Sequence, residues 1–201
     1  LEQRVEQNER KIVWYVVGLL VVIGLGLGYY YGIHRNGIDN ATEMIGQADI
    51  ALAQGNDSVA LQQYLQVADE YSNSIANRAN LNAAILLYQQ GKYEEAIKSV
   101  DNYDVNDELV GAAAASLKGD CLVNLQKYDE AISSFDKAIS TSNNNALYTP
   151  LFMMKKATVL NAQQKYAEAA EIYTAIKEKY PKYLIAYRVN IDKYIERANY
   201  L

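Results

Sequence analysis

The chain has 201 residues, half of them apolar, with only two prolines and a formal net charge of −5. This length accommodates one sizeable domain plus an appendage, and the scarcity of proline favours long uninterrupted helices. A mildly acidic chain without basic clusters is a poor candidate for binding nucleic acid, because neutralising phosphates requires patches of Lys and Arg. We therefore expect no nucleic acid among its partners.

The residues needed for catalysis or metal binding are scarce. Cys121 is the only cysteine and His34 the only histidine. One cysteine excludes an internal disulfide and a cysteine-rich zinc site. The one histidine lies in a Gly-rich stretch after a long apolar run, where no Ser-His-Asp triad is expected. The paired carboxylates Glu94 and Glu95 stand where a helix is expected to begin, and there they favour the helix dipole. The sequence thus predicts a protein that is not an enzyme, with no catalytic residue, no metal and no cofactor.

The N-terminal part contains an apolar run that is typical of a membrane span. Residues 12–31 read IVWYVVGLLVVIGLGLGYYY, which is twenty residues without a charge. At about 1.5 Å per residue this run is long enough to cross a bilayer. Aromatic residues lie at both ends, as they do at membrane interfaces. A cleaved signal peptide has a shorter apolar run, of about 7–15 residues. We therefore interpret 12–32 as one transmembrane helix in the lipid bilayer.

The charges that flank this helix predict its orientation. Three basic residues precede the apolar run, whereas only Arg35 follows it closely. Under the positive-inside rule, residues 1–11 form a cytoplasmic tail and residues 33–201 lie on the far side of the membrane.

Glycines recur along the predicted membrane helix. Gly24, Gly28 and Gly32 are spaced every four residues and so share one helix face. Such a smooth face allows a second helix to approach closely. Glycine is also common in membrane helices in general, so both a helix-packing face and a simple compositional reading stay open.

From residue 41 onward the sequence repeats itself. The alanines that close four aligned stretches are 36, 35 and 38 residues apart: Gly55–Ala60, Gly91–Ala96, Gln126–Ala131 and Gln164–Ala169. A small residue stands twelve positions before each alanine, and a larger apolar residue stands four positions after it. Small residues mark where paired helices cross closely, so each unit is predicted to be two helices joined by a tight turn.

These columns resemble the tetratricopeptide repeat, which has small residues at repeat positions 8 and 20, an aromatic at 24 and proline at 32. Pro181 fits the last position, whereas Asp57 departs from the pattern by standing where the other units have Tyr. The resemblance implies an all-α fold: a solenoid of helical hairpins after the transmembrane helix. We expect repeats at 41–74, 77–110, 112–145 and 150–183. Residues 184–199 are predicted to form a C-terminal capping helix, because a stacked array leaves an apolar face open at its end.

In this architecture the first helix of each repeat lines the concave side. Repeat positions 2, 5, 9 and 12 then select a candidate groove for a peptide or partner. The selected residues are Arg78, Leu81, Ile85, Tyr88, Ser116, Asp120, Val123, Met154, Thr158 and Asn161. Apolar and Tyr side chains with few charges suit an extended or partly unfolded peptide, although part of the set is expected to pack between helices instead.

The whole layout resembles the YfgM-like family in its Bacteroidota-type form. The stretches EKYP at 178–181 and IDKYIERA at 191–198 are similar to the end of such members. Members are ancillary subunits of the SecYEG translocon and are associated with the membrane chaperone PpiD. The resemblance implies a non-enzymatic adaptor in the bacterial inner membrane, with a periplasmic repeat domain. Its implied partners are the SecYEG channel, a PpiD-like chaperone and nascent secretory polypeptides.

A second function stays open on the same residues. The chain could be a scaffold subunit of another cell-envelope assembly or secretion complex. Tetratricopeptide adaptors of outer-membrane assembly are usually lipoproteins anchored by a lipidated cysteine, and no cysteine stands near the start of this sequence.

Overall fold

The computed structural model describes residues 2–30, 32, 35–105 and 107–200, with the backbone alone for 2–13, 35 and 36. Within these residues the chain contains helices and no strand. The helices are α1 Glu2–Tyr29, α2 Arg35–Ala53, α3 Asp57–Glu70, α4 Ser74–Gln89, α5 Tyr93–Asp101, α6 Glu108–Asn124, α7 Tyr128–Thr141, α8 Tyr148–Ala162, α9 Tyr166–Lys179, α10 Pro181–Ala186 and α11 Ile191–Asn199.

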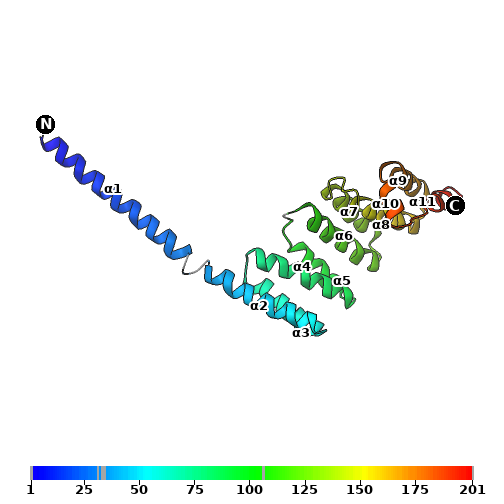
Figure 1. The fold of residues 1–201 in the computed structure, drawn as a ribbon, viewed down its shortest axis with the longest axis horizontal. Coiled ribbons are helices and arrows are strands. Elements are labelled where there is room, and N and C mark those ends of the chain that lie inside the picture. Colours follow the sequence, from blue (N-terminus) through cyan, green and yellow to red (C-terminus); the bar gives the residue numbers. More distant parts are fainter. Residues whose placement is uncertain (1, 31, 33–34, 106, 201) are drawn as a thin grey trace.

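The helices from α2 to α9 form four antiparallel hairpins that stack one after another. Each hairpin pairs two successive helices, and each packs against the next hairpin in the chain. Figure 1 shows this stack as a gradually turning array, with α1 extending away from it. The predicted all-α solenoid of helical hairpins is therefore confirmed.

The membrane prediction has a different outcome. No helix in the part of the chain that the structure describes is long and apolar enough to cross a membrane, so the transmembrane helix predicted over 12–32 is not supported. The side chains of residues 12 and 13, together with residue 31 and His34, lie outside the described residues. The described side chains of α1, from Trp14 to Tyr29, are all exposed.

The interior of each hairpin is built on the repeated alanines. Because a methyl group takes little space, the two helices of a hairpin approach closely at these positions. The four alanines are fully buried: Ala60, Ala96, Ala131 and Ala169. The residue one turn later on the same helix is also buried and fills the space beside the crossing: Tyr64, Val100, Phe135 and Tyr173.

A shared backbone turn joins the two helices of every hairpin. After α4, Gly91 adopts a left-handed conformation (φ 75°). Its N–H donates to the Tyr88 carbonyl (3.0 Å), and the next N–H, of Lys92, donates to the Leu87 carbonyl (2.9 Å). This bonding satisfies carbonyls that the end of a helix leaves unpaired. The same left-handed position is taken by Gly55, Gln126 and Gln164 in the other hairpins.

Glutamine at this position is expected to be costly. A non-glycine residue in the left-handed region costs about 1–2 kcal/mol. Replacing glutamine by glycine removes this cost, but the greater freedom of glycine in the unfolded chain offsets part of the gain. We expect Gln126→Gly to raise the free energy of unfolding by about 0.5–1 kcal/mol, as measured by urea unfolding. Gly91→Ala is the reciprocal control and should lower it by about 1 kcal/mol. Unchanged stability of Gln126→Gly would contradict this account of the turn.

The C-terminal cap differs from the single helix predicted over 184–199. The chain instead forms α10 and α11, separated by a turn in which Arg188 is left-handed (φ 52°). This turn reverses the chain, so the apolar side of α11 folds back onto α9. Ile191 is buried there, and the ring centroids of Tyr194 and Tyr173 are 5.3 Å apart. A continuous helix would have carried these side chains away from the end of the array.

Ion pairs connect the hairpins to one another. Every ion pair between described side chains crosses from one hairpin to its neighbour, or from the last hairpin to α11. The pairs are Asp49–Arg78, Asp101–Lys118, Asp120–Lys155, Asp136–Lys156, Asp129–Lys165 and Asp192–Lys177. Most of these side chains are substantially exposed, so each pair contributes about 0–1 kcal/mol.

Candidate partner-binding face

The ten residues of the predicted groove lie on α4, α6 and α8, the first helices of hairpins two to four. Contacts join α4 to α6 and α6 to α8, so these helices lie side by side along the array. The predicted residues therefore belong to one series of neighbouring helices. Their side chains have three different environments.

A polar cluster lies at the centre of this series. Lys155 on α8 donates to Asp120 Oδ2 (2.5 Å) and Ser116 Oγ (3.0 Å), both on α6. Burial raises the pKa of the Asp120 carboxyl above its ordinary value, and the hydrogen bond from Lys155 opposes this rise. Burial also raises the pKa of Tyr88, and the nearby Asp120 carboxylate raises it further. The structure thus joins Ser116 and Asp120 through one lysine, with Tyr88 near the Asp120 carboxylate.

A second group of predicted residues already has partners within the chain. Arg78 is ion-paired to Asp49 on α2, so its guanidinium is engaged by a carboxylate of the preceding hairpin. Asn161 donates from Nδ2 to the Tyr173 hydroxyl (2.9 Å). Three others are partly buried against the hydrophobic clusters of their hairpins: Leu81, Val123 and Met154.

The two remaining predicted residues are, like Arg78, exposed to solvent. Ile85 is 40% exposed, and Thr158 is exposed while its hydroxyl donates to the Met154 carbonyl (2.9 Å). The Oδ1 atom of Asn161, on the same helix as Thr158, is buried and has no hydrogen-bond partner among the described residues. Buried polar atoms are rarely left without a partner, and an atom without exposed surface can reach an outside donor only after its side chain turns.

Sequence reasoning missed the residue that organises the cluster. Lys155 directly follows Met154, which was predicted for the groove. Lys155 and Lys156 are the only charged residues of α8. A charged pair in an otherwise uncharged helix could have indicated a specific role for one of the two lysines. Asp49 was also missed, because it stands in the first hairpin, where no groove residue was predicted.

Removing Lys155 should make stability depend on pH. In Lys155→Met the partly buried Asp120 carboxylate loses its partner, and we expect the free energy of unfolding to fall by about 1–2 kcal/mol at pH 7. The pKa of Asp120 then rises further in the folded state than in the unfolded chain. Protonation consequently favours the folded state, so the deficit is full above the folded pKa and disappears as pH falls towards 3.8. Urea unfolding at several pH values between 7 and 3.8 measures this loss of stability.

The neighbouring lysine provides a matched control. Lys156 pairs with Asp136 (2.6 Å), whose side chain is 52% exposed and stays hydrated when the partner is removed. Lys156→Met should therefore change stability by only about 0.5 kcal/mol or less, without the pH dependence. An equal and pH-independent loss in the two variants would contradict a special role for the Asp120–Lys155 pair.

Metal chemistry is not suggested by the described side chains. Among them, no three His, Cys, Asp or Glu residues are grouped so that they could hold a metal ion. Cys121 is buried, and burial raises the pKa of its thiol to about 11, which keeps it protonated and unreactive at neutral pH.

Two family models match the repeat region. The model for a tetratricopeptide repeat-like domain matches residues 40–162, and a tetratricopeptide repeat model matches residues 152–183. Among characterised proteins, the chain is 29% identical over 195 residues to a Neisseria gonorrhoeae protein described as an ancillary SecYEG translocon subunit. That match covers 90% of each of the two chains.

Solved structures with the same arrangement of helices include MamA and YrrB. MamA is 20% identical with a TM-score of 0.59, and the match covers 75% of this chain and 91% of that one. YrrB, described as a tetratricopeptide repeat protein with an unusual peptide-binding site, is 18% identical with a TM-score of 0.58. Its match covers 84% of this chain and 87% of that one. At these identities the likeness concerns the fold alone.

Proposed function

The chain belongs to the tetratricopeptide repeat-like family and is YfgM-like within it, and on this basis we propose that it is a membrane-anchored adaptor at a SecYEG-type protein-conducting channel. Its repeat domain is a non-catalytic module for protein interaction. The observation that carries the proposal is the 29% identity, over 90% of both chains, with an ancillary SecYEG translocon subunit.

The extent of that match supports a shared function beyond a shared fold. The repeat-like family model begins only at residue 40. A match over 90% of the chain is too long to fit within the residues from 40 onward, so it includes part of the segment that contains α1. Tetratricopeptide repeats alone occur in proteins of many functions. Similarity that also includes the N-terminal segment is a more specific indication.

In this proposal, residues 12–32 are a single transmembrane helix of the bacterial inner membrane. The support comes from the uncharged run in the sequence and from its exposure in the structure. Trp14 is 74% exposed and Leu25 is 70% exposed, on a helix that extends away from the repeats (Figure 1). Apolar side chains exposed all around a helix are unfavourable in water and favourable in lipid.

The proposed orientation places the repeats in the periplasm. Arg4, Arg10 and Lys11 precede the apolar run, and Arg35 follows it. The excess of positive charge before the run favours a cytoplasmic N-terminus. The repeat domain would then meet polypeptides as they leave the channel, together with a PpiD-like membrane chaperone.

The candidate groove is the proposed contact surface for such nascent secretory polypeptides. Ile85 offers an exposed apolar contact on α4, and the exposed Thr158 lies on α8. An unfolded polypeptide presents apolar side chains, which complement the exposed surface of Ile85. The ion-paired Arg78 is expected to position α4 against α2 and to make no direct contact with a client.

Co-purification tests the proposed assembly. The full chain would be tagged at its C-terminus, crosslinked in native membranes, solubilised in mild detergent and purified by affinity. We expect SecY and a PpiD-like protein to be recovered with it. Recovery of neither would overturn the proposal, and recovery of outer-membrane assembly or secretion components instead would favour a scaffold function in another envelope complex.

The glycine face of the anchor can be tested in the same experiment. In the isolated chain, a Cβ atom added at Gly24, Gly28 or Gly32 would meet nothing within 4 Å, so larger side chains leave the chain itself undisturbed. Replacing the three glycines by leucine should reduce recovery of the channel, because close approach of a second helix is blocked. Gly26→Leu is the control, since Gly26 lies two residues from Gly24 and Gly28 and so faces roughly the opposite side of the helix.

A further inference from the structure

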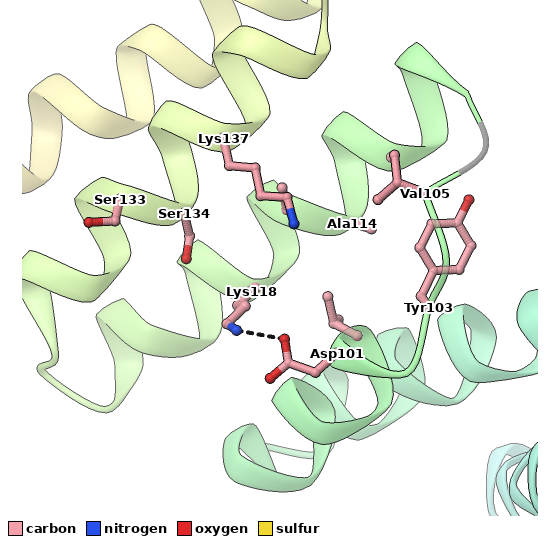
Figure 2. Close-up of a pocket in the computed structure, with 11 residues that line it drawn as sticks. Asp101, Tyr103, Val105, Ala114, Lys118, Ser133, Ser134 and Lys137 are labelled. Atoms are coloured by element: carbon pink, nitrogen blue, oxygen red, sulfur yellow. Dashed lines mark hydrogen bonds and ion pairs between the residues drawn. The ribbon is translucent and has the colours of Figure 1, made fainter.

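A pocket of about 210 Å³ lies between α5, α6 and α7, away from the groove residues discussed above. Its lining residues are Val100, Asp101, Tyr103, Val105, Gly111, Ala114, Ala115, Lys118, Ser133, Ser134 and Lys137. Figure 2 shows side chains from all three helices, and from the connection between α5 and α6, arranged around this space. No function proposed above uses it.

One part of the pocket is cationic. Lys137 extends from α7 towards α6 (Figure 2), and its ammonium has no ion-pair or hydrogen-bond partner among the described residues. Lys118 on α6 donates to Asp101 at the end of α5 (2.6 Å), and its side chain is 32% exposed. Ser134, next to these lysines in the lining, contributes a hydroxyl group. These groups are hydrogen-bond donors that an anion would require.

The opposite part of the pocket is apolar. Val105 and the Tyr103 ring come from the connection between α5 and α6, on the side away from Lys118 and Ser134 (Figure 2). Val105 is 45% exposed, so part of its surface is available for contact. A ligand that combined a negative group with a short aliphatic stem would contact both parts of the pocket.

The charge of the lining restricts the kind of anion. Lys118 and Lys137 are positive and Asp101 is negative, which leaves one net positive charge in the pocket. A single carboxylate balances this charge, whereas a dianionic phosphate would leave the occupied pocket with one net negative charge. The Asp101–Lys118 pair is itself an example of a carboxylate bound by one of these lysines.

We propose that this pocket binds the side-chain carboxylate of a glutamate in an extended segment of a partner protein. The carboxylate would lie between Lys137 and Lys118 and accept a hydrogen bond from Ser134. The methylene groups of the glutamate would pack against Val105 and Tyr103. The site gives the repeat array a second contact surface, independent of the α4–α6–α8 groove and of the proposed channel association.

Fluorescence anisotropy of the full chain in detergent tests this proposal. The probe is the pentapeptide Ala-Val-Glu-Val-Ala, labelled with fluorescein at its N-terminus and amidated at its C-terminus, so that glutamate is its only acidic residue. We expect saturable binding that is at least tenfold weaker when glutamate is replaced by glutamine. Binding should also weaken in about 1 M salt, where charges are screened over about 3 Å.

Variants of the chain locate the site. Lys137→Glu should weaken binding at least tenfold, whereas Lys127→Glu, the same charge change at the start of α7, should change it less than twofold. Asp101→Asn should tighten binding several-fold, because it removes a negative charge and releases Lys118. All three positions are exposed, so the variants are expected to fold, and circular dichroism verifies this.

Three results would overturn the proposal. The first is equal binding of the glutamine peptide, which would remove the role of the carboxylate. The second is an equal effect of Lys137→Glu and Lys127→Glu, which would indicate a general charge effect. The third is complete competition by inorganic phosphate at concentrations that leave the ionic strength unchanged, which would indicate a non-specific anion site.

Discussion

Phe135→Ala is expected to lower the free energy of unfolding by about 4 kcal/mol, within the range for buried aromatic side chains replaced by alanine. Phe135 is only 1% exposed and packs against Leu122, Ala131 and Val159, which come from α6, α7 and α8. Its ring therefore fills the junction between the third and fourth hairpins. Removing it leaves a cavity that these backbones cannot close, and urea unfolding measures the loss.

The glycine opposite the ring makes this prediction more specific. A Cβ atom at Gly119 would lie 2.6 Å from Cε1 of Phe135, closer than atoms can approach without displacement. Gly119→Ala should therefore lower stability by about 1–2 kcal/mol, although alanine normally stabilises a helix interior by about 1 kcal/mol. In the Phe135→Ala background the added methyl group has room. The double variant should thus be more stable than Phe135→Ala alone.

Gly46→Ala is the control for this argument. Gly46 is also inside a helix, but a Cβ atom there would meet nothing within 4 Å. The same substitution should raise the free energy of unfolding by about 0.5–1 kcal/mol. If Gly119→Ala stabilised the protein as Gly46→Ala does, the close contact between Gly119 and the Phe135 ring would be refuted.

Tyr173→Ala is expected to lower stability by about 3–4 kcal/mol and to release the C-terminal helix. Tyr173 is 1% exposed, its hydroxyl accepts a hydrogen bond from Asn161 on α8, and its ring lies beside Tyr194 on α11. One side chain therefore links three helices. Repeat arrays are coupled mainly between neighbours, so the damage should be local.

Hydrogen–deuterium exchange can resolve this local effect. In Tyr173→Ala the amides of α11 should lose protection, while those of α2 to α5 keep theirs. Tyr173→Phe removes only the hydroxyl group and should cost about 1 kcal/mol, with α11 still protected. Uniform loss of protection along the whole chain would show that the array unfolds as one unit and would contradict the prediction.

The repeated alanines made most of the fold predictable from sequence. Ala60, Ala96, Ala131 and Ala169 recur at nearly constant spacing, and each is fully buried where two helices cross. A helix crossing is a local property of one hairpin, so it leaves a mark in every repeat. The turn before each alanine is local as well, which explains why glycine and glutamine share one column and one left-handed conformation.

Other features depend on geometry that no single repeat records. The division of the terminal helix occurs at Arg188, where no glycine or proline indicates a left-handed residue. The polar cluster around Lys155 depends on the rotation of α8 relative to α6, which determines whether Asp120 or solvent faces the lysine. For the same reason the periodic pattern selected Leu81 and Val123 for the groove, although both pack partly against the hydrophobic interior.

The ion pairs between successive hairpins have a consequence for how the array responds to salt. Apolar contacts and exposed charges both contribute at the joints between hairpins: Phe135 fills one joint, and the pairs Asp49–Arg78 and Asp101–Lys118 cross two others. Salt screens exposed charges, so a rise in ionic strength should weaken only the part that the ion pairs contribute, about 0–1 kcal/mol per pair. The apolar contacts at the joints are not screened, and the stacking of the hairpins should therefore depend little on salt.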